Sequence, residues 1–363
     1  MSYLILGGCG FIGRNLVSHL LDNELAETIV VIDKIPPAMA WLSAKHKTAF
    51  EDSKVTFKSI NLLSRMNIDK IKELGVTFDY CVNLAAETKL GLSKEIYEER
   101  VTKLAQNCAL FAKDQQVKLY VELSSAQVYG SSGKTSKEDS KTNPKYDFES
   151  CKLKAEEEVA KVAGLNHVIL RAGMVYGPGD RLGYITSQLV IASIYSHLGE
   201  TMKLIWNKNM YVNTVHVEDL CHAVTHLIKD GIPGETYNVV DMGDTILDGI
   251  CVHVGNIFDI KYEYISSFTS MLASISLKDV AEDVNEKHLS PWSEMCSKAG
   301  ISNTPLSPFI YSSQLETLNI RACNHKLLAT GFQFKRPGVT EENIRDVLED
   351  CVKIGIFPKT NVK

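Results

Sequence analysis

A glycine-rich turn near the N-terminus constrains the fold of this chain most strongly. The short apolar run Tyr3–Leu6 is followed directly by GGCGFIG at residues 7–13, and then by a helical pattern. Glycine in such a turn permits a tight bend and lets the backbone approach a diphosphate, while the helix N-terminus supplies free N–H groups. The strand before and the helix after give the motif the context it requires. The turn predicts a dinucleotide-binding unit; the alternative is that its glycines serve packing alone.

Asp33 indicates which dinucleotide is expected. It stands at the end of the second predicted strand, directly after Thr28–Ile32 and twenty residues after Gly13. A carboxylate at this place accepts hydrogen bonds from ribose hydroxyls and repels a 2′-phosphate. We therefore expect NAD rather than NADP, although Lys34 beside it keeps NADP as an alternative.

Short apolar runs alternate with longer amphipathic stretches throughout the first half of the chain. Such alternation implies right-handed crossovers and a parallel sheet with helices on both faces. Strands that are apolar nearly throughout are typical of burial on both faces. We expect an α/β fold, a Rossmann-type doubly wound parallel sheet with a smaller, mostly C-terminal α+β domain. The predicted strands are Tyr3–Leu6, Thr28–Ile32, Val55–Ile60, Tyr80–Leu84, Lys118–Leu123, His167–Leu170, Val215–Val217 and Thr236–Val240.

The domain division follows from a change in the alternation of predicted strands and helices after residue 180. Residues 1–180 and 212–240 are assigned to the NAD-binding domain, and residues 181–211 and 241–363 to a substrate or partner domain. Beyond residue 241 the pattern is less regular, and Pro291, Pro305 and Pro308 indicate a loop-rich segment. A late helix is expected over Glu341–Ile354, because Thr340 and two glutamates form a good N-terminal signature.

Composition excludes several classes of partner. The net charge of −5, without a basic stripe, gives no reason to expect nucleic-acid binding. Nine cysteines, odd in number and without a C-x-x-C pair, favour free thiols in a reducing compartment. No apolar stretch approaches the roughly 20 residues that span a bilayer. The first strand begins at residue 3 and leaves no room for a signal peptide. We therefore expect a cytoplasmic protein without membrane association.

The order of motifs resembles the NAD-dependent epimerase/dehydratase family, the extended short-chain dehydrogenases/reductases. After the glycine turn come five segments similar to that family's motifs, in the same order, between residue 83 and about residue 240. They are NLAA at 83–86, SSAQVYG at 124–130, LRAGMVYGPGD at 170–180, VHVEDL at 215–220 and TYNV at 236–239. The resemblance implies the Rossmann-type fold and a site for NAD.

The resemblance also implies roles for individual residues. Residues 61–62 would flank the adenine, and residues 85–86 would line the nicotinamide side. Ser125 would orient a carbonyl or hydroxyl of the substrate, and main-chain groups near residues 174–175 would meet the nicotinamide ring. The expected cofactor-binding residues are Gly7, Gly10, Phe11, Ile12, Gly13, Asp33, Asn61, Leu62, Leu84, Ala85, Ala86, Lys152, Met174 and Val175.

The catalytic motif of the family is altered in this chain. In the family, Y-x-x-x-K opens a helix; the tyrosine exchanges a proton with the substrate, and the lysine holds the ribose. Lys152 resembles that lysine, but Phe148, which has no ionisable proton, stands four residues earlier. The nearest tyrosine, Tyr146, lies about 240° from Lys152 around a helix, so it serves only if the chain before Phe148 is not helical. The expected catalytic residues are Ser125, Lys152 and, on that condition, Tyr146.

Two classes of function remain open. The first is an NAD-dependent oxidoreductase or epimerase with an altered active site and an unknown small-molecule substrate, which Ser125 and Lys152 favour. The second is a cofactor-binding pseudoenzyme, a subunit for a protein partner or a homodimer, which Phe148 favours. Val212 stands where an arginine often meets nucleotide-sugar phosphate in the family, so sugar-nucleotide dehydratase chemistry is disfavoured. No metal site is expected, because no glutamate completes an H-E-x-x-H pattern at the histidines 222 and 226.

Overall fold

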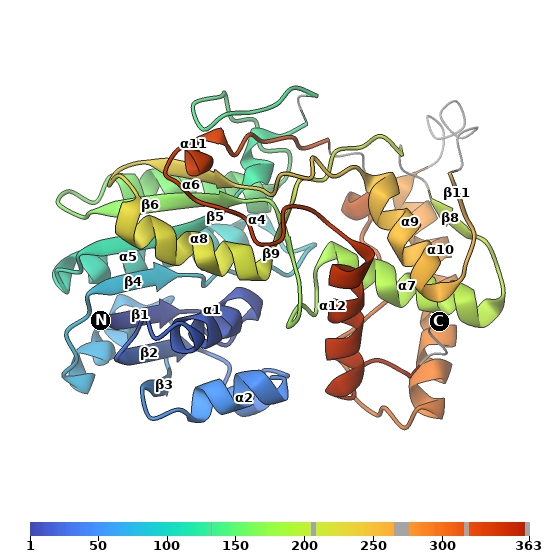
Figure 1. Ribbon diagram of the computed structural model, residues 1–363, viewed down its shortest axis with the longest axis horizontal. Helices are drawn as coiled ribbons and strands as arrows, with labels where there is room; N and C mark the ends of the chain where they lie inside the picture. Colours follow the sequence, from blue (N-terminus) through green and yellow to red (C-terminus); the bar gives the residue numbers. More distant parts are fainter. Residues whose placement is uncertain (132, 205–207, 265–275, 316–318, 360–363) are drawn as a thin grey trace.

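A seven-stranded parallel sheet forms the centre of the computed structural model, which describes residues 1–363 except 132, 205–207, 265–275, 316–318 and 360–363 (Figure 1). The strand order is β10-β6-β5-β4-β1-β2-β3, and every neighbouring pair is parallel. The strands are β1 (Ser2–Leu6), β2 (Thr28–Asp33), β3 (Val55–Ser59), β4 (Tyr80–Asn83), β5 (Leu119–Ser125), β6 (His167–Ala172) and β10 (Thr236–Val239). The predicted doubly wound α/β fold is confirmed.

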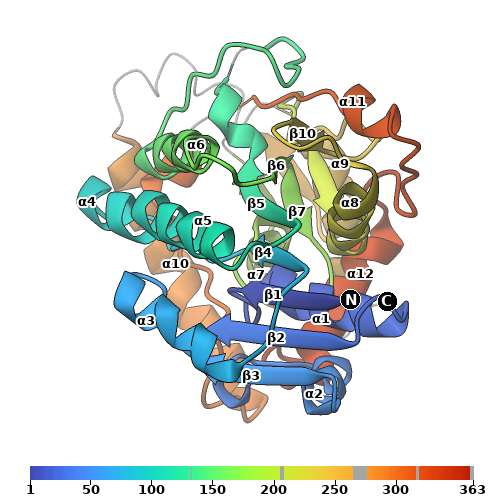
Figure 2. The same cartoon turned by 90° about the vertical axis from the view of Figure 1, so that its left-hand side faces the viewer.

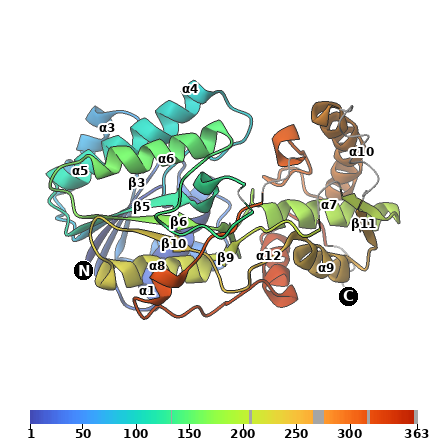
Figure 3. The ribbon, with the colours of Figure 1, turned by 90° about the horizontal axis from the view of Figure 1, so that it is seen from above.

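Helices cover both faces of this sheet (Figures 2 and 3). On one face lie α1 (Phe11–Asp22) and α8 (Val217–Asp230); on the other lie α3 (Arg65–Asp69), α5 (Leu104–Asp114) and α6 (Asp147–Ala160). Alternate residues of a strand join different cores: Ile5 packs in the cluster with α1 and α8, whereas Leu4 packs in the cluster with α3, α5 and α6. Burial on both faces explains why the sequences of these strands are continuously apolar.

Shorter elements complete the sheet-bearing part. A helical stretch begins with α4 (Lys94–Tyr97), continues through a π-helical segment, η3 (Glu98–Lys103), and runs into α5. A short parallel pair joins β7 (Met174–Tyr176) to β9 (Thr214–His216). The remaining elements here are η1 (Pro37–Met39), α2 (Ala44–Glu51), η2 (Lys70–Leu74) and η4 (Ala126–Tyr129).

Apart from the two clusters that pack on the sheet, a hydrophobic cluster lies beyond the carboxyl ends of the strands; it is called the second hydrophobic cluster below. It is built mainly by α7 (Tyr184–Leu198), α9 (Leu247–Phe258), α10 (Leu277–Lys298) and α12 (Glu341–Lys353), to the right in Figure 1. β8 (Met202–Leu204) pairs in parallel with β11 (Tyr262–Tyr264) at its edge. The predicted loop around Pro291 was wrong, because Pro291 lies inside α10. The buried residues Ala281, Asn285, His288, Trp292 and Met295 recur every three or four positions, and this helical period outweighs one proline.

A late segment returns from this cluster to the sheet-bearing part. Ile320 bridges to Val212, and Ala322 bridges to Ser136. η6 (Ser312–Leu315) precedes it, α11 (His325–Leu328) follows it, and Phe332 is buried in the cluster with α1 and α8. All nine cysteines are free thiols. Within the described parts of the chain, no helix has both the length and the apolar character to cross a membrane.

Candidate functional site

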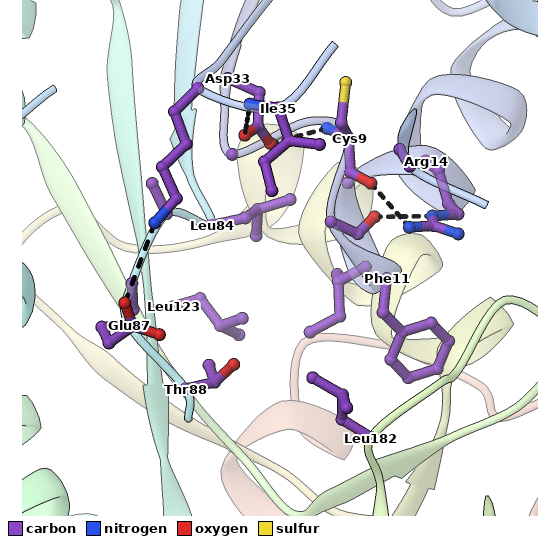
Figure 4. Close-up of a pocket in the computed structure, with 18 of the residues that line it drawn as sticks. Cys9, Phe11, Arg14, Asp33, Ile35, Leu84, Glu87, Thr88, Leu123 and Leu182 are labelled. Atoms are coloured by element: carbon purple, nitrogen blue, oxygen red, sulfur yellow. Dashed lines mark hydrogen bonds and ion pairs between the residues drawn. The ribbon is translucent and has the colours of Figure 1, made fainter. Parts of the chain in front are cut away.

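A pocket of about 850 Å³ opens at the carboxyl ends of the central strands (Figure 4). It lies where β1 separates β4 from β2, so that the chain turns to one side of β1 and then to the other. Ligands of open α/β sheets bind at this kind of switch point. Thirteen of the fourteen predicted cofactor residues line the pocket; Met174 is the exception, being packed against the second hydrophobic cluster.

Of the four glycines in the turn, Gly7, Gly10 and Gly13 are required for different structural reasons. A side chain on Gly7, whose φ is +78°, would place its Cβ 2.7 Å from the backbone of Ala85. One on Gly13 would place its Cβ 2.5 Å from the Cα of Gly8. Gly10, the N-cap of α1, is exposed in the pocket wall, and its Cβ would meet only the Gly7 carbonyl oxygen, at 3.1 Å. Packing therefore requires Gly7 and Gly13, while Gly10 leaves open space that a diphosphate at the helix N-terminus fits.

Asp33 is held rigidly at the end of β2. Its Oδ2 accepts a hydrogen bond from Cys9 N and its Oδ1 one from Ile35 N, both at 3.0 Å (Figure 4). The neighbouring Lys34 Nζ lies 3.8 Å from Glu87 Oε2, and Arg100 Nη1 donates to the same oxygen at 3.2 Å. These interactions keep the Asp33 carboxylate at the pocket edge and direct the Lys34 ammonium to Glu87.

Two buried arginines line the pocket wall beside the turn, and sequence reasoning did not identify them. Arg14 donates to the Cys9 carbonyl at 2.8 Å and to the Trp41 carbonyl at 3.2 Å. Burial and then the nearby Arg181 lower the pKa of Arg14 to about 10. Arg181 Nη2 donates to Asp350 Oδ2 of α12 at 2.8 Å. The wall of the glycine turn is thus linked to the helical cluster, through contacts between residues more than 160 positions apart in the sequence.

Ser125, Phe148 and Lys152 all line the same pocket as the glycine turn. Ser125 caps η4, where its Oγ accepts a hydrogen bond from Gln127 N at 3.1 Å. The Phe148 ring meets the Tyr97 ring edge-on at 5.7 Å between centroids, within a small apolar cluster. The pocket wall therefore includes the Ser125 hydroxyl, the Lys152 ammonium and the apolar Phe148 ring.

Tyr146 is not part of this lining. It is the N-cap of α6 with extended backbone, so the helix begins at Asp147, one residue before Phe148. Its hydroxyl donates to the Ser313 carbonyl at 3.3 Å. The structure therefore does not bring Tyr146 together with Ser125 and Lys152, since the helix start turns its side chain toward a different segment.

The histidines of α8 make contacts typical of packing. The rings of His222 and His226 lie 4.8 Å and 5.4 Å from the Phe332 ring, and His226 Nε2 is 2.7 Å from Thr330 Oγ1. Burial is the largest cause that lowers the pKa of His222. Among the residues that the structure describes, no group of three or more His, Cys, Asp or Glu side chains is arranged to hold a metal ion.

Comparison with known proteins identifies the family. The model of the NAD dependent epimerase/dehydratase family matches residues 3–240, the part that contains the whole central sheet and the glycine turn. The chain belongs to this family. Membership agrees with the position of the pocket at the carboxyl ends of the strands.

Relatives and solved structures agree with this family. The chain is 25% identical to the low-salt glycan biosynthesis protein Agl12 of Haloferax volcanii, over 66% of this chain and 76% of that protein. It is 29% identical to a decarboxylating sterol-4-alpha-carboxylate 3-dehydrogenase of Candida albicans, over 67% of this chain and 71% of that protein. UDP-glucuronic acid 4-epimerase of Bacillus cereus, solved with UDP-glucuronic acid and NAD, superposes with a TM-score of 0.71 at 17% identity, covering 98% of this chain and 100% of that one. The last likeness shows a shared fold.

Proposed function

We propose that this protein binds NAD(H) in the pocket and is an epimerase/dehydratase-like oxidoreductase with an altered acid–base site, acting on a small molecule. One observation carries the proposal: the glycine turn, Asp33, Ser125 and Lys152, which are far apart in sequence, line a single pocket. Bound NAD would supply hydride transfer. Solved structures of similar fold contain NAD, which supports the choice of cofactor.

The lining fits the cofactor residue by residue. The open space at Gly10 and the free N–H groups of α1 would receive the diphosphate. The Asp33 carboxylate would accept hydrogen bonds from the adenosine ribose. Lys152 would donate to the second ribose, and Ser125 would orient the oxygen of the substrate. We further infer that Phe148 occupies the place of the family's catalytic tyrosine, because its ring lines the pocket between these two residues and the Tyr97 cluster.

NAD is expected to bind at least about tenfold more tightly than NADP, because a 2′-phosphate would lie beside the fixed Asp33 carboxylate. Lys34 gives little compensation, since its ammonium is paired with Glu87. Calorimetric titration of both nucleotides tests this. Asp33→Asn should reduce the difference, whereas Asp22→Asn, which removes an exposed carboxylate paired with Lys45, should leave it unchanged. Equal affinity of the wild type for both nucleotides would refute the role given to Asp33.

The second candidate is an NAD-binding pseudoenzyme that acts as a structural or regulatory subunit, with a protein partner or as a homodimer. The observation that favours it is the apolar environment of Phe148, together with the place of the Tyr146 hydroxyl outside the pocket lining. A ligand that binds only the folded state stabilises it, so a retained cofactor has a role even without turnover. The Phe148 variants considered in the Discussion separate the two candidates.

A further inference from the structure

A carboxylate lies buried in the middle of the parallel sheet. Glu122 belongs to β5, which has strands on both sides, and only 1% of its side chain is exposed. Its Oε2 accepts hydrogen bonds from Tyr120 Oη at 2.7 Å and Asn83 Nδ2 at 2.8 Å. Its Oε1 has no hydrogen-bond partner within the described part of the chain. A buried carboxylate is costly unless it is paired: burial raises the pKa of Glu122, and a nearby cation is the largest influence that lowers it.

Lys152 is that cation. Its side chain, 9% exposed, reaches from α6 to the sheet, where Nζ donates to the Leu123 carbonyl at 2.7 Å and lies 3.9 Å from Glu122 Oε1. Lys152 and Leu123 both line the pocket. An ammonium has three donors, and the bond to Leu123 uses one of them. The lysine therefore stands between a buried carboxylate and the pocket, with donors left for a ligand.

Among the titratable groups around Glu122 that the structure describes, Lys152 is the one that supplies a positive charge. Burial lowers the pKa of Lys152, and Glu122, followed by Glu156, raises it. Glu156, on the same helix, is already held by the guanidinium of Arg171, which donates to both of its oxygens. The other titratable groups that face Glu122 are the buried Tyr120 of β5, Cys81 of β4 and Cys108 of α5, and burial raises the pKa of each, so all three are neutral.

We propose that Glu122 is a positioning residue of the cofactor site: its carboxylate keeps the Lys152 ammonium charged and fixed in the pocket wall, ready to donate to hydroxyls of the bound nucleotide. This rests on the proposed binding of NAD(H). On the side of the sheet, Glu122 and the Leu123 carbonyl surround the Lys152 ammonium in place of water. A ligand can therefore reach the ammonium only from the pocket. The Lys152 ammonium thus contributes its charge to binding whether or not a phenol stands near it.

Binding of NADH, followed by its fluorescence between pH 7 and pH 9.5, tests the role of Glu122. Burial lowers the pKa of Lys152 and Glu122 partly offsets this, so the wild type should keep its affinity to higher pH than a variant without the Glu122 charge. Glu122→Gln keeps the size of the side chain and an acceptor for Tyr120, but it removes the charge. Because the ammonium then loses its proton at lower pH, affinity should fall by about tenfold or more across this range. At pH 7 the loss should be smaller.

Additional variants assign the effect to the lysine. In the Glu122→Gln background, Lys152→Arg should give a flat pH profile, because a guanidinium does not titrate in this range. Lys152→Met alone should bind weakly at every pH. Glu349→Gln, which removes an exposed carboxylate paired with Lys353 on α12, should match the wild type. If Glu122→Gln does not fold, Glu122→Asp, which withdraws the charge by one methylene, should shift the profile in the same direction.

The outcomes are distinct. A pH profile in Glu122→Gln that matches the wild type, or in Glu122→Asp when only that variant folds, overturns the positioning role while NADH binding itself stands. A pH-dependent loss that persists with Lys152→Arg also overturns it, because another group would then titrate. If the wild type binds no NADH at any pH, the proposed function fails instead.

Discussion

Gly10→Val is expected to raise the Kd for NAD by at least about 100-fold while the fold stays intact. Gly10 has an extended backbone, with φ −66° and ψ 174°, which valine adopts without strain. Its Cβ would meet only one protein atom within 4 Å, and the remaining carbons would extend into the space at the N-terminus of α1. The added side chain would therefore displace the diphosphate rather than the protein. Calorimetry gives the affinity, and thermal unfolding without nucleotide gives the stability.

Two other glycines provide the comparison. Gly249→Val in α9, where a Cβ would meet nothing within 4 Å, should retain both affinity and stability. Gly13→Ala should lower the unfolding temperature even without nucleotide, because its Cβ would lie 2.5 Å from the Cα of Gly8. If Gly10→Val binds NAD as the wild type does, the glycine turn serves packing only and the cofactor site must lie elsewhere.

Phe148→Tyr is expected to create or increase NAD-linked turnover by about 10²–10⁴-fold, the usual contribution of a positioned general acid–base group. The new phenol would stand four residues before Lys152, on the same side of α6 and in the lining that contains Ser125. The ring already fits among Tyr97, Val101 and Cys151, so only one oxygen is added. The measurement is NADH formation or consumption with a panel of small alcohols, ketones and nucleotide sugars.

The controls separate an enzyme from a pseudoenzyme. Phe50→Tyr on α2 adds the same hydroxyl outside the pocket lining and should change nothing. If the wild type turns over and Tyr146→Phe abolishes it, the proton passes through Tyr146, and the site must rearrange from the geometry in which that hydroxyl contacts Ser313. If the wild type, Tyr146→Phe and Phe148→Tyr are all inactive while NAD still binds, the catalytic reading fails and the subunit role is favoured.

Much of the fold was predictable because its signals are local. The turn at 7–13 is marked by its own run of glycines, and the strands of the sheet are marked by continuous apolar residues because both faces are buried. That most of the proposed cofactor residues line one pocket was predictable for a related reason. They stand at the carboxyl ends of parallel strands, and these ends meet at one edge of the sheet.

The helix α10 shows where local signals misled. Pro291 is a strong breaker taken alone, but the helix it occupies buries Trp292 and Met295 against the second hydrophobic cluster. Tertiary packing of that face outweighs the loss of one backbone hydrogen bond. The period of the buried positions is visible in the sequence, so a search for periodicity across the proline would have found this helix.

The sequence by itself determined the parallel sheet, the glycine turn, Asp33 at the end of β2, and the absence of a tyrosine four residues before Lys152. The tertiary structure alone decided which charges meet: Arg181 with Asp350, Lys34 with Glu87, and Lys152 with Glu122. It also decided that the Tyr146 hydroxyl lies against Ser313. The physical reason is range. Glycine turns and apolar runs are visible within short segments of the chain, whereas a buried charge is compensated by whichever group the fold brings within a few ångströms, at any sequence separation.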